Sequence, residues 1–198
     1  AGEVPEITEQ FITSIVQYSD TNEVVVNMTM GHDLKNNRGF SNFFGGAAFP
    51  QPLEELDRFD IDKFFAIAGP SGEQQCQERN MTGSIGVFFD FPKQVTREHN
   101  ETVNGRNCAV WSYQDLNNTF KFYGAPNTES GALEPVRVQC VSAPAWHADY
   151  FNFLAGPPPM ADYHIPKGVS CKPATLRKDL TLRQTVVAQF VEFRKLVK

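Results

Sequence analysis

Apolar and polar residues alternate along much of residues 11–155 with the two-residue period of a half-buried β-strand. The stretch VVVNMTM (24–30) shows this clearly, because Val26 and Met28 share one face of the predicted strand and Asn27 lies on the other. Clusters of Gly, Pro, Asn and Asp between such stretches predict turns. The strands predicted in this way span 11–18, 24–30, 38–44, 59–69, 107–114, 119–124, 135–142 and 146–155.

The stretch GSIGVFFDFP (83–92) has apolar residues at both alternating sets of positions. In a strand, Phe89 and Phe91 would share one face and Phe88 would lie on the other, which favours a strand buried on both faces. Together with the other strands, it predicts one large antiparallel sheet, a sandwich or an open barrel.

The pattern changes after residue 155. Residues 156–173 are rich in proline and predict an extended crossing, whereas residues 175–198 have the apolar spacing of an amphipathic helix with a basic side. We expect this helix to cover the sheet or, alternatively, to bind a partner. The predicted organisation is a β domain over 1–173 and a C-terminal amphipathic helix over 174–198 that packs on it.

Composition narrows the classes of function. The chain has 198 residues, a formal net charge of −5, and 17 Phe, 5 Tyr and 2 Trp. The negative charge argues against nucleic-acid binding, which calls for clustered Lys and Arg. No apolar run reaches the roughly 18 residues of a membrane-spanning helix, so we expect no transmembrane segment.

Two features indicate a secreted glycoprotein. The glycosylation signal Asn-X-Ser/Thr occurs more often than the content of Asn, Ser and Thr gives by chance. The cysteines form an even set without a Cys-X-X-Cys pair, which favours disulfides in an oxidising compartment over zinc. The expected glycosylation sites are Asn27, Asn80, Asn100 and Asn117, and the expected disulfide cysteines are Cys76, Cys108, Cys140 and Cys171.

The sequence contains no Gly-X-Ser-X-Gly, no His-Glu-X-X-His and no phosphate-binding glycine loop. Because the histidines are scattered and the cysteines have candidate partners, we expect no enzymatic activity. The acidic stretch LEELDRFDID (53–62) offers oxygen ligands to Ca²⁺ but lacks the order of an EF-hand loop. A solvated loop leading into a strand is the alternative, and no residue is assigned to a metal.

The aromatic residues carry most of the information about function. In the hairpin of residues 109–124, Trp111 and Tyr113 share one face of the first strand, and Phe120 and Phe122 share one face of the second. Such rings form either a Phe-rich core or the wall of an apolar cleft, because flat rings line slots for long flat ligands. The predicted wall residues are Phe88, Trp111, Tyr113, Phe120, Phe122, Phe151 and Phe153.

An ordered series of short motifs runs over residues 8–173. It begins with the strand FITSIVQY and the D-x-x-N-x-R pattern of Asp33, Asn36 and Arg38. It continues with Cys76 after the FFAIAG strand, Trp111-Ser112, Thr119-Phe120, Pro135-Val136, the Phe151 strand leading to Gly156, and Pro166 to Cys171. In this order the motifs resemble the ependymin-related family of secreted glycoproteins.

The resemblance implies a mainly β fold with helices (α+β), similar to the bacterial lipoprotein-carrier (LolA-like) type. In that fold a strongly curved antiparallel sheet is open like a half barrel, with helices at its mouth around a hydrophobic pocket. The resemblance also implies lipid-like ligands, carotenoids among them, as well as calcium in some members and a homo- or heterodimer with a related chain. Because such domains precede proteases in some organisms, the chain is alternatively the N-terminal domain of a longer precursor.

The resemblance also implies a Cys76–Cys171 disulfide, because only these two cysteines match positions of the family. Cys108 and Cys140 then remain as candidate disulfide partners of each other. In a simple meander, however, these two residues lie two strands and about 10 Å apart, which is too far for a disulfide. Either the sheet bends there, or these cysteines pair differently, or they link two chains.

The predicted function is that of a secreted carrier, which holds a carotenoid or another long apolar ligand non-covalently in an aromatic pocket. The alternative from a different class is an extracellular adhesion or signalling glycoprotein that binds another protein.

Overall fold

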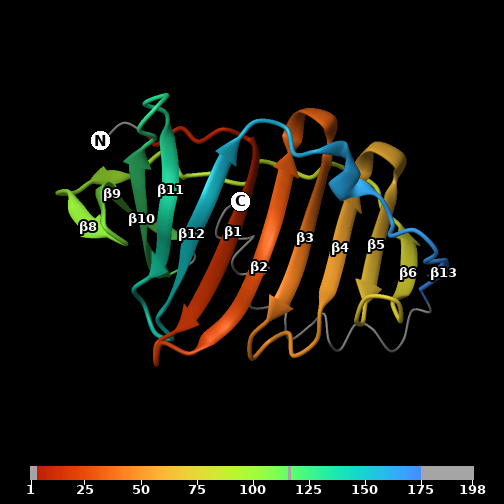
Figure 1. Cartoon of the computed structure of the whole chain (residues 1–198). Helices are drawn as coiled ribbons and strands as arrows, with labels where there is room; N and C mark the ends of the chain where they lie inside the picture. The colour runs from red at the N-terminus through yellow and green to blue at the C-terminus, as the bar shows by residue number, and fades with distance from the viewer. Residues whose placement is uncertain (1–3, 116, 175–198) are drawn as a thin grey trace.

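The computed structural model describes residues 4–115 and 117–174, which form one open sheet of 13 strands. The strand order is β13-β6-β5-β4-β3-β2-β1-β12-β11-β10-β9-β7, with β8 paired to β9 (Figure 1). Of these pairs only β13 and β6 run parallel. The strands are β1 (Gln10–Ser19), β2 (Val24–Asp33), β3 (Arg38–Gly45), β4 (Leu53–Arg58), β5 (Lys63–Ala68), β6 (Gln75–Asn80), β7 (Thr96–Arg97), β8 (Glu101–Val103), β9 (Arg106–Asp115), β10 (Asn118–Pro126), β11 (Leu133–Cys140), β12 (Trp146–Ala155) and β13 (Cys171–Pro173).

The strands with clear two-residue alternation are confirmed, since the predicted segments in 11–44 and 107–155 coincide with β1–β3 and β9–β12, except that β11 ends at Cys140, two residues before the predicted end of 135–142. The predicted strand over 59–69 is only partly confirmed. Its first residues form the 3-10 helix η2 (Phe59–Ile61), which ends at Asp62 in the left-handed region (φ 55°) before β5 begins. The 3-10 helix η1 (Leu34–Asn36) joins β2 to β3 in the same way and ends at Asn37 (φ 54°). Asn and Asp tolerate this conformation better than most residues.

The strand predicted over 83–92 is wrong, because residues 81–95 have no regular secondary structure. Gly83 and Gly86 have φ values of 112° and 76°, which regular β-strand geometry excludes. The backbone N–H groups of Phe88 and Phe89 donate to the side-chain carboxylate of Glu9. The segment lies close against the sheet, because a Cβ added to Gly39 in β3 would come within 2.5 Å of the Ile85 side chain.

The α+β fold class with helices at the mouth of the sheet is also wrong, because the described residues are β-strands joined by loops and short 3-10 helices. Two irregular segments, 81–95 and 156–170, cover the sheet in place of helices. The second contains the run GPPPM and the 3-10 helix η3 (Met160–Tyr163), and prolines in series cannot supply the N–H donors of an α-helix. The predicted C-terminal helix lies outside the described residues from residue 175 on.

The two covering segments lie on opposite faces of the sheet, as Figure 1 shows. We call the face under residues 81–95 the aromatic face; its buried cluster includes Phe11, Met28, Trp111 and Phe122. The other face carries two smaller clusters. One joins β3–β6 to Tyr163 of η3, and the other lies on β9–β11 around Cys108 and Tyr123.

The predicted Cys76–Cys171 disulfide is confirmed, and it joins β6 to β13 at the end of the segment 156–170. The expectation of a disulfide from Cys108 and Cys140 is wrong. Cys108 lies on β9 and Cys140 on β11, on opposite faces and with β10 between them. Both thiols are buried, at 0% and 4% exposure, so neither is placed to link two chains.

We expect reduction of the Cys76–Cys171 disulfide to lower the free energy of unfolding, because the bridge closes a loop of 95 residues in the unfolded chain. In the chain-entropy model the loss is at most about 4–5 kcal/mol. Urea unfolding with and without reductant measures it, and the double variant Cys76→Ser, Cys171→Ser serves as the control. Equal sensitivity of wild type and double variant to reductant would contradict this prediction.

Candidate ligand-binding face

Most of the predicted wall residues lie together in the buried cluster of the aromatic face. Each is less than one tenth exposed, so they occupy one interior and no surface slot. The members that the sequence predicts are Phe88, Trp111, Tyr113, Phe120, Phe122 and Phe153. Whether they bind a ligand stays a prediction.

The rings of this cluster contact one another. Phe122 lies at its centre, with ring centroids 4.8 Å from Phe91, 5.8 Å from Trp111 and 6.0 Å from Phe89. Tyr113 and Phe120 stack at 5.5 Å across β9 and β10. Such pairs stabilise by about 0.5–1.5 kcal/mol beyond their area burial. Among these residues the rings therefore form a core, and space for a ligand has to adjoin them or be opened between them.

Phe151 does not belong to the aromatic face, although its spacing to Phe153 places both on one side of a regular strand. In β12 the register shifts, so that Ser14 pairs with Phe151 and Ile12 with Leu154. This β-bulge contains Asn152 in the left-handed region (φ 52°). As a result Phe153 is buried in the cluster and Phe151 is 37% exposed on the other face.

The sequence prediction missed several rings of the cluster, namely Phe11, Phe89, Phe91 and Tyr150. Phe11 stacks on Phe153 at 5.1 Å, and its alternation with Ile15 in FITSIVQY was a usable signal. Phe88 and Phe89 are both buried in the cluster because residues 81–95 are irregular, and strand alternation could not have predicted that.

Glu9 fixes the irregular segment to the sheet. Its carboxylate accepts hydrogen bonds from Phe88 N (2.7 Å) and Phe89 N (3.3 Å), and its Oε2 lies 3.1 Å from Nε2 of the buried His32. The His32 ring stacks on Phe11 at 5.5 Å. One carboxylate at the start of β1 therefore holds the part of the segment that covers the rings.

A groove of 670 Å³ adjoins the aromatic cluster at its β9–β10 end. Residues 92–96, from the end of the covering segment and the start of β7, line one side. The other side is formed by Ser112, Tyr113, Gln114 and Thr119. Val95 and Tyr113 belong both to the groove and to the cluster, so the groove borders the buried rings.

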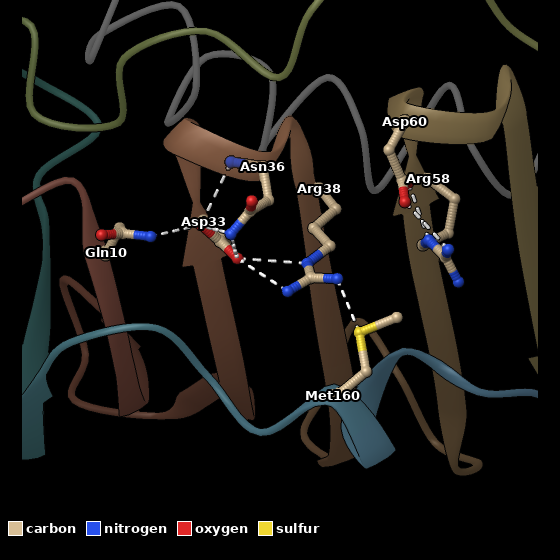
Figure 2. Close-up of polar contacts among 7 residues, drawn as sticks. All are labelled: Gln10, Asp33, Asn36, Arg38, Arg58, Asp60 and Met160. Atoms are coloured by element: carbon tan, nitrogen blue, oxygen red, sulfur yellow. Dashed lines mark hydrogen bonds and ion pairs between the residues drawn. The ribbon is translucent and has the colours of Figure 1, made fainter.

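The D-x-x-N-x-R residues form a hydrogen-bond network around the buried Asp33 (Figure 2). Asp33 is 0% exposed and accepts hydrogen bonds from Gln10 Nε2 (2.6 Å), Asn36 Nδ2 (2.8 Å) and Arg38 Nε (3.1 Å). The Arg38 guanidinium lies 4.4 Å from the centre of the Tyr163 ring in η3. The network therefore binds the segment 156–170 to β1–β3, which is a structural role.

The acidic stretch 53–62 is mainly strand and not the expected solvated loop. It forms β4 and η2, so its side chains alternate between the two faces, and Asp60 pairs with Arg58 at 2.8 Å. Among the described residues, the potential metal ligands whose ligand atoms lie within 4.8 Å of one another are Glu98, His99 and Glu101. Lys121 already pairs with Glu98 there at 2.8 Å.

The asparagines of the four glycosylation signals, Asn27, Asn80, Asn100 and Asn117, are all exposed and therefore accessible to modification. Asn27 pairs with Val16 and shares the face of Ser14 and Phe151, opposite to the aromatic face. None of the helices in the described part of the chain is long and apolar enough to cross a membrane.

Neither a scan of protein-family models nor a search of curated proteins finds a match to this chain. Similar solved structures include PNGF-II in two crystal forms, at 7% and 10% identity with TM-scores of 0.36 and 0.34. The match covers 91% of this chain but only 33% and 34% of the PNGF-II chain, so this chain spans about a third of that protein. A LolA superfamily protein from Nitrosomonas europaea is 8% identical with a TM-score of 0.36, over 82% of this chain and 93% of that one. Scores this low do not establish a shared fold.

We expect Glu9→Gln to loosen the segment 81–95 while the sheet stays folded. The neutral amide accepts weaker hydrogen bonds than the carboxylate, so exchange of the Phe88 and Phe89 amides should accelerate about tenfold. Hydrogen exchange with mass spectrometry of peptides from 81–95 measures the change, and the exposed Glu6→Gln is the matched control. Unchanged exchange in Glu9→Gln would show that other contacts hold the segment.

We expect Asp33 to make stability depend on pH in the acid range. Burial by itself would raise the Asp33 pKa, but hydrogen bonds from Asn36, Gln10 and Arg38 outweigh it and hold the pKa below its usual 3.8. The stabilisation is then complete above the usual pKa and is lost as the pH falls through the lowered one. Wild type should therefore lose stability below about pH 4, and Asp33→Asn should lose less of it. Urea midpoints across this range test the difference against the exposed Asp20→Asn, and equal slopes in all three proteins would contradict it.

Proposed function

We propose that this protein is a secreted carrier that holds a long apolar ligand, such as a carotenoid or another lipid, on the aromatic face. The supporting observation is the combination of a continuous ring cluster, an irregular cover over it, and an adjoining groove of 670 Å³ at Tyr113. Residues 81–95 cover rings that come from β1, β9, β10 and β12. The ligand would lie between this segment and the strand rings.

The burial that a ligand chain gains exceeds the cost of exposing the two rings that it would displace. Exposing Phe88 and Phe89 costs about 1.5–3 kcal/mol for each ring. Burying a ligand chain of about a dozen methylenes yields on the order of 10 kcal/mol at ~0.8 kcal/mol for each group. The main-chain N–H groups of these two residues are held by a side chain and not by a β-ladder, so their release breaks no strand pairing.

Secretion and glycosylation are part of the same proposal. The Cys76–Cys171 disulfide is typical of proteins from oxidising compartments, and the exposed glycosylation signals fit that environment. A dimer with a related chain is proposed with them, because large apolar side chains are exposed on the face opposite to the rings. These are Phe44 (59% exposed), Phe151 (37%) and Leu154 (63%).

The same exposed side chains support the second candidate, a glycoprotein that binds another protein. A glycan on Asn27 would argue against this candidate, and equally against a dimer over the same side chains, because Asn27 pairs with Gly45, next to Phe44, and a sugar chain there would compete with either protein partner. The carrier function requires no access to that face.

We expect native protein, extracted with organic solvent, to release a long apolar molecule, and stripped protein to rebind it. Phe122→Leu should weaken rebinding about tenfold, because it removes the central ring but keeps apolar volume in the core. Phe151→Leu is the matched control on the opposite face and should bind as wild type does. Mass spectrometry of the extract, followed by titration of the stripped proteins, measures both. A ligand-free native protein that binds no apolar molecule would contradict the carrier function.

A further inference from the structure

The hydroxyl of Tyr150 is a buried donor that nothing in the described part of the chain satisfies. Tyr150 lies in β12 on the aromatic face and is 4% exposed, and its hydroxyl oxygen is buried without a hydrogen-bond partner among the described residues. A buried donor without a partner destabilises a folded protein by more than a hydrogen bond usually stabilises it. A phenylalanine would fill the same space without that cost, so the hydroxyl calls for a partner from outside the described residues.

Tyr150 lies among the residues that would surround the proposed ligand. The centroid of its ring lies 5.9 Å from that of Phe89 in the covering segment, and Tyr150 pairs with Ile15 of the neighbouring strand β1. Burial, and then the nearby Tyr113, raise the pKa of Tyr150 well above its usual range, so the hydroxyl stays a neutral donor. Tyr113 itself lines the groove of 670 Å³.

The charges of the cluster residues restrict which ligand groups can bind next to the Tyr150 hydroxyl. Among the described residues, no member of the cluster carries a positive charge. A carboxylate or phosphate brought next to Tyr150 would be buried without a counter-charge, which is strongly unfavourable. A water molecule would need two to four polar partners, and the cluster around Tyr150 consists mainly of apolar side chains.

We propose that the Tyr150 hydroxyl donates a hydrogen bond to a neutral oxygen of the carried ligand. The ligand class is a long apolar molecule with a ketone, hydroxyl or ester carbonyl that reaches the centre of the ring cluster. The inference rests on the proposed carrier function and narrows its ligand, because hydrocarbons and free fatty acids are both disfavoured. In this arrangement the rings bind the apolar length of the ligand, and Tyr150 fixes its position along the cluster.

Competition between two probes tests the proposal. Stripped protein is incubated with equal amounts of hexadecane and the methyl ketone of the same chain length, separated from unbound probe, and extracted for quantification by mass spectrometry. The ratio of bound ketone to bound hexadecane should be roughly three- to tenfold higher in wild type than in Tyr150→Phe, as expected for one buried hydrogen bond. Tyr150→Phe should bind the ketone less well than hexadecane, because it buries the ketone carbonyl without a donor, and without ligand it should be at least as stable as wild type. Tyr163→Phe, also buried but on the opposite face, is the matched control and should keep the wild-type ratio.

The outcomes distinguish failure of the proposed Tyr150 hydrogen bond, here called the anchor, from failure of the carrier function. If Tyr150→Phe binds the two probes in the same ratio as wild type, the proposed hydrogen bond is wrong and the carrier function stands. If wild type binds neither probe, the carrier function fails, and the anchor fails with it. A third incubation with palmitate tests the charge argument, and tighter binding of palmitate than of the ketone would overturn the neutral ligand class.

Discussion

A single-layer sheet with apolar side chains on both faces has to be covered on both sides, and every other feature of this protein follows from that constraint. The aromatic face buries its rings under residues 81–95, and the opposite face buries Phe40, Leu56 and Phe65 under residues 156–170. Neither cover has the backbone pairing of a strand or an α-helix. Their positions therefore depend on side chains that accept or donate hydrogen bonds and on one disulfide.

The polar contacts of both covers converge on one corner of the sheet. Glu9 binds the backbone of Phe88 and Phe89 on the aromatic face. The next residue, Gln10, donates to Asp33, whose network with Arg38 holds η3 on the other face. These contacts meet at the β1–β2 pair, so neighbouring residues of one corner hold both covers. The Cys76–Cys171 disulfide lies at the far edge, where it holds the end of residues 156–170 independently of this corner.

The part of the fold that sequence predicts well is the set of strands with one buried and one solvated face. Apolar and polar residues alternate in FITSIVQY and VVVNMTM because one face of β1 and β2 is densely covered and the other is more exposed. Strand β4 was missed because LEELDR carries acidic residues on both faces, while Leu56 alone is completely buried. The error at Phe151 has a local cause, since one bulge residue, Asn152, reverses the faces of all residues that follow it.

The sequence by itself determined the half-buried strands and the excess of aromatic residues, because hydrophobic periodicity and composition are properties of the chain that survive without tertiary contacts, whereas the Cys76–Cys171 pair was expected only from the family resemblance. The tertiary structure alone decided that the rings of residues 81–95 pack on those of β9 and β10, that Cys108 and Cys140 lie on opposite faces, and that the Tyr150 hydroxyl is buried in an apolar interior. These facts depend on which segments far apart in the chain cover each other, and no pattern within one segment encodes that choice.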